Sequence, residues 1–284
     1  VPDFRTVKRF AVDGSEAVLD KVEQQAEYPE SNLSETKYEY SVAKYGRRVP
    51  FAWEAIINDD LDALKDIPAR LGRAARRTEE KFVTQLFVDT NGPHASFYTV
   101  GNKNKVTGNP ALSIAALQTA FATLAAQTDA DGEPILIDAV ELVVPPALEV
   151  TALNILNAIQ LEITAAGGTA DQKVIAANWM RNRLRLNVNP YIPIVASTAN
   201  GNTSWFLFAS PANGRPALEI GFLRGHTEPE IFIKEPNARR VGAGVADPMA
   251  GDFDTDSIQY KVRHVLGGTR IDPKMTVASN GSGS

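Results

Sequence analysis

Residues 47–61 read RRVPFAWEAIINDDL and mark the point where an extended segment turns into a helical one. Apolar and polar residues alternate with a period of two over 37–42 and again over 48–53, which is typical of strands. Gly46 lies between the two runs and is predicted to form a turn. The pattern therefore predicts a charged two-stranded ribbon, and a ribbon of two strands is only marginally stable in water by itself.

Helices are predicted directly after this ribbon. Asn58 or Asp59 caps a short helix that runs through Lys65, and Asp66 caps a longer one with Pro68 in its first turn. One face of the longer helix carries side chains at helical spacing: Leu71, Ala74, Ala75, Thr78, Phe82 and Leu86. Its other faces carry four arginines: Arg70, Arg73, Arg76 and Arg77.

The arginine cluster is predicted to be a solvated helix face or an acid-paired subunit contact. Arg76 is expected to pair with Glu80 one turn later. Glu79 and Glu80 lie among the arginines and argue against binding of nucleic acid. Asn91-Gly92-Pro93 is predicted to end the helix.

The remaining elements predict an α+β fold. Residues 1–18 have scattered apolar positions and are predicted to form an extended arm. A helix is expected after Ser113, and the strand 139–144, ended by Pro145-Pro146, is followed by a helix through Leu156. The last third predicts a meander with segments at 192–195, 205–208, 218–222 and 230–233. A polar loop is predicted at 236–252 and a late strand at 257–265.

Composition bounds the classes of function. With 284 residues the chain has room for about two domain units, and 44% hydrophobic with 22% charged residues is ordinary globular composition. A net charge of −5 argues against broad binding to DNA or anionic membranes. The absence of cysteine excludes disulfides, thiolate metal sites and cysteine nucleophiles. The longest uncharged stretch, 106–128, carries too many polar residues for a membrane span.

No motif for catalysis or for a cofactor is found. The chain has neither a glycine-rich phosphate loop nor a Gly-x-Ser-x-Gly elbow, and His94, His226 and His264 are too far apart for a local metal pair. The acidic turn 129–132 lacks the later Gly and Glu of a calcium loop. His264 is the best candidate for a dispersed hydrolase site with a Ser or Asp, but an alternating strand favours a sheet role. We therefore assign no catalytic, cofactor-binding or metal-binding residue.

Several stretches, taken in chain order, resemble one known family. They are RRVPFAWEAIINDDL (47–61), RLGRAARRTE (70–79), LVVPPALE (142–149), FLFA (206–209) and the strand 258–265. They are similar to the ribbon-to-helix junction, the spine helix and the strand-Pro-Pro-helix turn of the major capsid protein of tailed phages. The closest resemblance is to the Mu-like prophage major head subunit family, and it covers nearly the whole chain.

The resemblance implies the Hong Kong ninety-seven capsid fold. Its parts would be an N-terminal arm (1–18), an E-loop (19–56), a peripheral domain with a long spine helix (57–137 and 236–284) and an axial domain (138–235). The implied function is a structural one, not enzymatic: self-assembly as pentamers and hexamers into an icosahedral shell around double-stranded DNA. On the expected ribbon we assign subunit-interface roles to Tyr38, Tyr40, Arg47, Arg48, Phe51 and Trp53.

The resemblance also implies partners and a location. The chain itself is the main partner, beside a maturation protease, portal and decoration proteins, with DNA inside the shell contacted without sequence specificity and no membrane involved. Cleavage by the protease would account for a chain that begins at Val1. The protein would be assembled in the host bacterial cytoplasm and reside in the virion. Some members crosslink subunits through a Lys–Asn isopeptide, but no matching motif maps onto Lys21, Lys37 or Lys44.

Two other functions stay open at this point. One is a hydrolase with a Ser or Asp and His264, which a cluster of His264 with a buried acid in a pocket would favour. The other is a different virion component on a similar scaffold, which copy number in purified particles would separate from the capsid protein.

Overall fold

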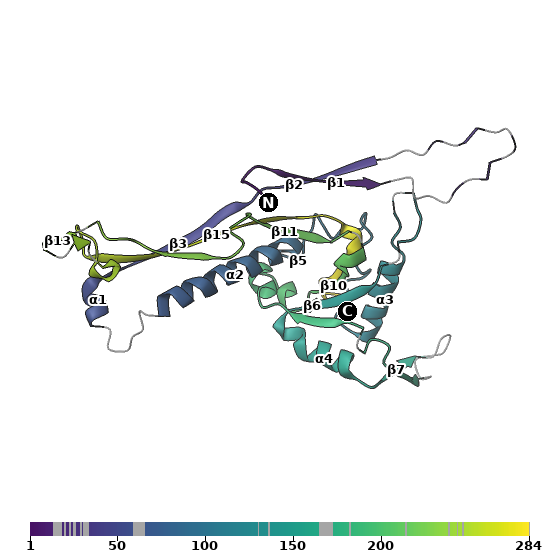
Figure 1. Ribbon diagram of the computed structural model, residues 1–284. Coiled ribbons are helices and arrows are strands. Elements are labelled where there is room, and N and C mark those ends of the chain that lie inside the picture. The colour runs from purple at the N-terminus through teal and green to yellow at the C-terminus, as the bar shows by residue number, and fades with distance from the viewer. Residues whose placement is uncertain are drawn as a thin grey trace. The chain divides into compact units, whose positions relative to one another are not determined.

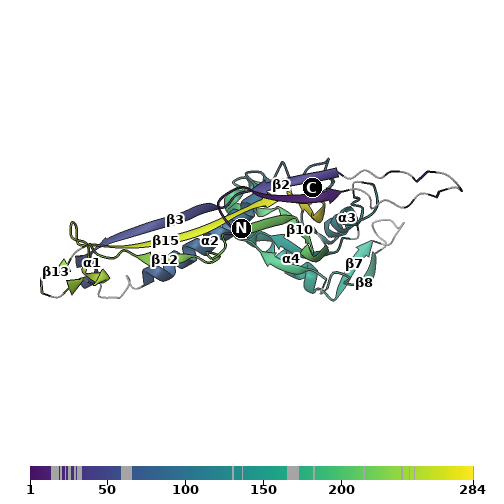
Figure 2. The same ribbon diagram turned by 45° about the horizontal axis from the view of Figure 1, so that its top comes forward.

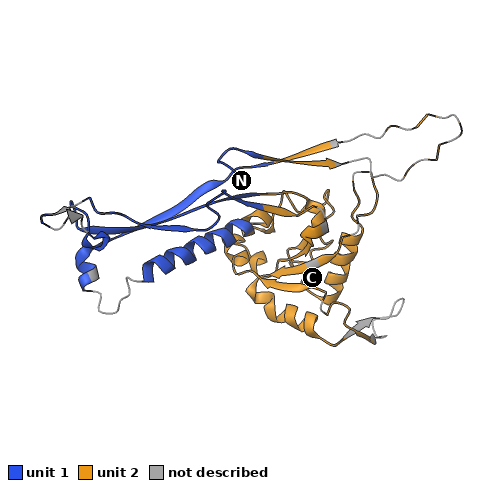
Figure 3. Cartoon of the chain, viewed as in Figure 1, with its two compact units in different colours: residues 1–7, 39–83, 220–268 blue, residues 8–38, 84–219, 269–284 orange. Residues whose placement is uncertain are grey.

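The structure is a computed structural model of the whole chain. The residues that it describes are 1–13, 19, 21–22, 24, 27–28, 30, 34–58, 66–129, 131–135, 137–164, 173–181, 183–213, 215–237, 239–242, 244–245 and 247–283. They form two compact units, shown in two colours in Figure 3. Unit 1 comprises residues 1–7, 39–83 and 220–268, and unit 2 comprises residues 8–38, 84–219 and 269–284.

Unit 1 is organised around the long strand β15 (Ser257–Arg270). The strand β3 (Ala43–Ala52) runs antiparallel to it along one side, from Ser257 opposite Ala52 to Leu266 opposite Ala43. The short strands β11 (Leu218–Phe222) and β12 (Glu230–Ile233) also pair with β15. Figures 1 and 2 both show β3 and β15 side by side. The predicted late strand at 257–265 is thus confirmed, and it continues to Arg270.

The helix α2 (Ile67–Phe87) covers one face of this sheet. Its apolar stripe packs Leu71 and Ala75 against Val262 of β15, with partly buried Val49, Ile67 and Tyr260 around them. The predicted helix is confirmed, including Pro68 in its first turn, although it ends at Phe87 rather than at Asn91. A tight turn follows, in which β4 (Val88–Asp89) pairs with β5 (Gly92–Pro93) and Gly92 takes a φ of 107°.

The predicted ribbon around Gly46 is wrong in its pairing. Gly46 lies inside β3, and the preceding strand β2 (Ser34–Tyr40) pairs with β1 (Val7–Asp13) instead of with β3. A Cβ on Gly46 would lie 2.7 Å from the Val262 carbonyl oxygen. The glycine therefore permits close approach of two strand backbones and does not form a turn.

Two further local predictions differ from the structure in part. A short helix α1 (Trp53–Ile57) begins as soon as β3 ends, earlier than the predicted helix 58–65. Most of that predicted helix, residues 59–65, lies outside the described residues. Part of the predicted arm 1–18 forms the strand β1, which is paired rather than simply extended.

Unit 2 has a four-stranded sheet in the order β16–β10–β6–β9. These strands are β6 (Ala139–Val144), β9 (Arg185–Val188), β10 (Trp205–Ala209) and β16 (Thr276–Ser279). The helices α3 (Ile114–Ala125) and α4 (Glu149–Asn157) contribute to the same core, which includes the fully buried Trp205 and Leu207. The predicted helix after Ser113 is confirmed, and the Ser113 hydroxyl accepts a hydrogen bond from the Ala116 amide at 3.1 Å.

The predicted meander at 190–235 is not one sheet. Residues 192–195 form the short helix α5 (Ile192–Val195), because Pro193 fits the first turn of a helix and Asn189 accepts the Tyr191 amide at its start. The strand β10 pairs with β6 and β16, whereas β11 and β12 pair with β15. The remaining strands form hairpins: β7 (Gln160–Thr164) with β8 (Lys173–Ala177), and β13 (Arg239–Arg240) with β14 (Gly244–Val245). This last hairpin interrupts the loop predicted at 236–252.

Candidate subunit-contact surface

The six residues predicted at a subunit interface lie on two different pairings. Tyr38 and Tyr40 belong to β2, and Tyr40 is buried. The Tyr40 hydroxyl packs on Gly221, 2.6 Å from the point where a Cβ would lie if that residue had one. The other four lie along β3 and the start of α1: Arg47, Arg48, Phe51 and Trp53. The structure therefore brings these four together beside β15, and Tyr40 packs inside unit 1.

Alternation along β3 and β15 gives the sheet of unit 1 two different faces. Val49 and Val262 pack in the cluster with α2, so their strand neighbours Arg48 and Lys261 point to the opposite face. The Phe51 ring packs against the Tyr260 ring, with centroids 5.6 Å apart. Two more basic residues share the face away from α2, namely Lys44 and Arg263.

A groove of about 400 Å³ lies along the paired strands β3 and β15, and we call it the basic groove. Its lining consists of Lys44, Tyr45, Gly46, Arg47, Arg48, Lys261, Val262 and Arg263. None of these described lining residues is acidic. Arg48 and Lys261 lie directly opposite each other across the two strands. Like charges in this position destabilise a sheet, so the pair carries a cost within the isolated chain.

Neighbouring side chains offset part of this positive charge. Arg263 donates to Glu230 of β12, and His226 contacts the other oxygen of the same carboxylate. These hydrogen bonds, the one from Arg263 first, lower the pKa of Glu230. The cations of Lys261 and Arg263 lie 4.8 and 4.9 Å from the ring centroid of Phe232. Arg48 makes a long contact of 3.4 Å to the Gln259 amide oxygen.

A tightly organised turn lies near the start of β15, and we call Gly251–Asp256 the Asp252 turn. The buried Asp252 carboxylate accepts from the Thr255 amide and hydroxyl at 3.0 and 2.9 Å, and from the Ser257 amide and hydroxyl at 3.1 and 3.0 Å. Hydrogen bonding, with the Ser257 amide first, lowers the pKa of Asp252. Lys234 approaches the same carboxylate at 3.3 Å.

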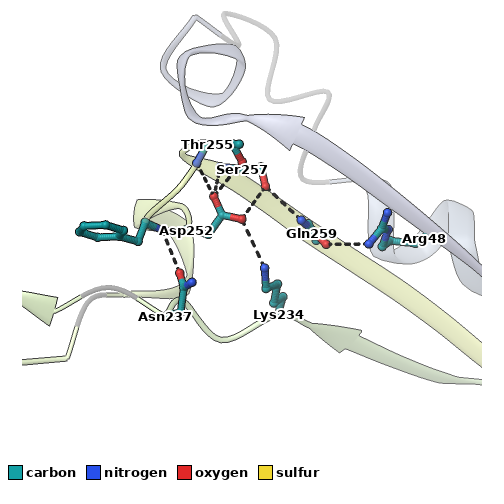
Figure 4. Close-up of polar contacts among 8 residues, drawn as sticks. Arg48, Lys234, Asn237, Asp252, Thr255, Ser257 and Gln259 are labelled. Atoms are coloured by element: carbon teal, nitrogen blue, oxygen red, sulfur yellow. Dashed lines mark hydrogen bonds and ion pairs between the residues drawn. The ribbon is translucent and has the colours of Figure 1, made fainter.

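A polar chain connects the Asp252 turn to the basic groove. Figure 4 shows Gln259 between Ser257 and Arg48, donating to the Ser257 hydroxyl and accepting from the Arg48 guanidinium. The Trp53 amide donates to the Asp256 carbonyl at 3.0 Å, which attaches α1 to the turn. Large apolar side chains are exposed around this end of unit 1: Trp53 (42%), Ile57 (64%), Met249 (43%) and Phe253 (78%).

His264 is in the core and has an acidic neighbour. It is 2% exposed, and its Nε2 lies 2.7 Å from Glu79 Oε1, although the geometry of this close pair does not meet that of a hydrogen bond. It lines a pocket of about 310 Å³ whose hydroxyl groups are those of Tyr45 and Thr78. Thr78 already donates to the Ala74 carbonyl, and no serine lines the pocket. The acid expected of a hydrolase is present, but its nucleophile is missing from this described lining.

Sequence reasoning missed the roles of Lys261 and Arg263 in the basic groove, of Glu79 beside His264 and of Asp252 in its turn. The alternation at 257–265 does place Lys261 and Arg263 on one strand face. Which strand lies opposite them is not encoded locally. In the part of the chain that the structure describes, no group of three or more His, Cys, Asp or Glu side chains is arranged to hold a metal ion, and no helix is long and apolar enough to cross a membrane.

Comparison with known proteins identifies the family to which this chain belongs. A family model described as phage capsid protein matches residues 35–279. The chain belongs to the phage capsid protein family. A search of the curated proteins found no match for the capsid protein. Family and fold together confirm the prediction of a phage major capsid protein, a structural component of the virion; the Mu-like subfamily remains a prediction.

Solved phage structures share the fold of the capsid protein at low sequence identity. The capsid structure of the cyanophage P-SCSP1u aligns with a TM-score of 0.58 at 12% identity, covering 98% of this chain and 84% of that one. A structure from Mycobacterium phage Che8 aligns with a TM-score of 0.55 at 15% identity, covering 98% and 85%. A structure from Microbacterium phage Oxtober96 gives 0.53 at 12%, covering 96% and 85%. The predicted α+β capsid fold is confirmed.

Proposed function

We propose that the capsid protein assembles as pentamers and hexamers into the icosahedral head of a tailed phage, around double-stranded DNA. The observation that carries this proposal is the family match over residues 35–279. The proposed division is an N-terminal arm (1–18), an E-loop (19–56), a peripheral domain (57–137 and 236–284) and an axial domain (138–235). Within it β3 anchors the E-loop segment to the peripheral segment, because it pairs with β15 over its whole length.

The subunit contacts are proposed to involve Tyr38, Tyr40, Arg47, Arg48, Phe51 and Trp53. Exposure supports this for Trp53, which is 42% accessible, and for the exposed Arg47 and Arg48. The two-stranded sheet of β1 and β2 supports it further, because Phe10 and Val12 of β1 are more than half exposed. A two-stranded sheet buries little apolar surface by itself, and a neighbouring subunit would cover the exposed side chains.

The finer partners follow from the same proposal. The shell would be built in the host bacterial cytoplasm with a maturation protease, portal and decoration proteins, and the packaged DNA would be contacted without sequence specificity. A net charge of −5 supports weak rather than tight contact with DNA.

Electron microscopy and sedimentation velocity of the purified chain under assembly conditions test the proposal. Closed shells with pentameric and hexameric capsomers are the expected result. A chain that stays monomeric under all conditions, or that occurs in only a few copies in purified particles, would instead indicate a different virion component.

A hydrolase remains the second candidate, because His264 lines a pocket and has the Glu79 carboxylate beside it. The purified chain, assayed with activated ester and phosphate-ester probes, should show no turnover that His264→Ala abolishes. Turnover lost in that variant, with its fold preserved, would establish the hydrolase instead.

A further inference from the structure

The basic groove carries positive charge that the described residues of one copy leave largely unmatched. Arg48 and Lys261 face each other across β3 and β15, and the described residues that line the groove include no acid. The Glu230 carboxylate offsets the charge of Arg263. Lys261 lies over an aromatic ring, that of Phe232, and Arg48 contacts a neutral amide, that of Gln259. A sheet that keeps like charges opposite each other in this way is stabilised when an anionic group binds between them.

The Asp252 turn has complementary properties. Gly251 takes a φ of 82° and its Cβ position lies 2.7 Å from the Asp256 backbone, so the turn requires glycine there. The Asp252 carboxylate holds the Thr255 and Ser257 amides. Asn237 accepts the amide of Phe253 at 2.8 Å. This network orders a short turn whose central side chain, Phe253, is 78% exposed.

Two carboxylates accompany the exposed ring. Asp254 and Asp256 are both exposed, whereas Asp252 is buried among its hydrogen bonds. An aromatic side chain on an already ordered backbone is typical of a binding hot spot, because little further ordering is needed on binding. The turn therefore has the features of a preformed anionic and aromatic ligand.

We propose that in the assembled shell the Asp252 turn of one copy docks into the basic groove of a neighbouring copy. Asp254 and Asp256 would face Arg48 and Lys261, and the Phe253 ring would lie over these cations. Phe232 already receives Lys261 and Arg263 in this way within one copy, so the groove is suited to an aromatic face. This inference rests on the proposed function, because it requires copies of the chain side by side.

A second acidic segment of the chain is the competing occupant. Residues 13–35 contain seven acids and one base: Asp13, Glu16, Asp20, Glu23, Glu27, Glu30, Glu35 and Lys21. We favour the Asp252 turn because it combines carboxylates with an aromatic anchor on an ordered backbone. The experiment below includes the competitor as an outcome.

Charge exchange between the two surfaces tests the docking. Arg48→Glu with Lys261→Glu reverses the groove, and Asp254→Lys with Asp256→Lys reverses the turn. Each reversed chain alone should lose particle yield by about tenfold or more, as measured by sedimentation velocity and electron microscopy. An equimolar mixture of the two chains should regain particles, because each copy then offers a surface that fits the other. Combining all four substitutions in one chain should also restore assembly.

Neutral variants keep the test valid if a reversed chain fails to fold. Arg48→Gln with Lys261→Gln removes the like-charge pair, so the unassembled chain should melt at an equal or higher temperature while its particle yield falls. Phe253→Ala should also lower the yield without lowering the melting temperature. A lower melting temperature together with an unchanged yield would overturn the proposal.

The remaining outcomes separate this inference from the proposed function. Wild-type and all reversed chains that assemble equally would overturn the docking and leave the capsid function standing. Assembly of the groove-reversed chain could instead be restored by Glu27→Lys with Glu30→Lys and not by the reversed turn. This result would show that the groove binds the acidic segment, and it would overturn the docking. A wild-type chain that forms no particles would overturn both.

Discussion

His264 of β15 and Glu79 of α2 lie against each other inside unit 1, with Nε2 and Oε1 2.7 Å apart. The histidine is 2% exposed, and its ring lies 5.8 Å from that of Phe222. Glu79 also accepts from Arg76 at 3.0 Å. The contact joins a side chain of α2 to one of β15, so His264 contributes to the packing of the helix on the sheet.

Replacing His264 by Ala is expected to destabilise the unassembled chain by about 2–3 kcal/mol, because it leaves a cavity in the interior of unit 1. Assembly at low temperature should persist, because the His264 side chain is buried within the subunit. Urea unfolding of the variant and of Arg77→Ala, an exposed neighbour on the same helix, provides the comparison. Equal stability of both variants would contradict a structural role for His264.

Asp252→Asn is expected to loosen the Asp252 turn, since an amide cannot accept all the hydrogen bonds of the carboxylate. Hydrogen bonding lowers the pKa of Asp252 in the fold. Its stabilisation is therefore complete above the unfolded pKa of about 3.9 and is lost as the pH falls below that value. The difference in melting temperature between wild type and variant should be constant from pH 7 to 5 and shrink below about pH 4. A difference that grows on acidification would contradict this assignment.

Gly46→Ala is expected to cost about 1–3 kcal/mol, because its Cβ would lie 2.7 Å from the backbone oxygen of Val262. Gly72→Ala is the matched control: it lies within α2, and the nearest atom, of Ile231, is 3.9 Å from its Cβ position. Alanine is favoured over glycine inside a helix, so this variant should gain about 0.5–1 kcal/mol. Thermal unfolding of both variants measures the contrast, and a stabilising Gly46→Ala would show that the strands approach less closely than described.

Hydrogen exchange should show different protection of the backbone amides in the strands β1, β2 and β3 of the first 56 residues. The amides of β1 and β2 are expected to exchange fast in the unassembled chain and slowly in particles, because ordering costs about 1–2 kcal/mol per residue and two strands offset little of it. The strand β3 is expected to be protected in both states, since it pairs with β15 over ten residues. Residues 71–86 of α2 should also be protected in both. Equal protection of β1 and β2 before and after assembly would weaken the proposed role of a neighbouring subunit.

Particles are expected to contain no covalent crosslinks between subunits. No acid and Asn motif of the crosslinking members could be matched to Lys21, Lys37 or Lys44. Boiling particles in detergent should therefore give one band at the mass of the single chain on an electrophoretic gel. A ladder of bands at multiples of that mass would contradict the prediction.

Local patterns in the sequence were sufficient for most of the elements. The helical spacing from Leu71 to Leu86 predicted α2, the alternation at 257–265 predicted β15, and Ser113 predicted the start of α3. These signals lie within a few residues of one another, because hydrogen bonding and side-chain periodicity in a helix or strand are themselves local. The order of these elements was enough to predict the capsid fold through the resemblance.

Partner choice between strands was decided only by the tertiary structure. Two alternating runs with Gly46 between them predicted a hairpin, whereas Gly46 lies inside β3 and β3 pairs with β15, about two hundred residues later. A glycine that forms a turn and a glycine that lets two backbones approach are indistinguishable in one sequence. The same long-range pairing places Arg48 opposite Lys261, and the packing of α2 on the sheet places Glu79 beside His264. Such contacts depend on burial summed over distant segments, so only the folded chain determines them.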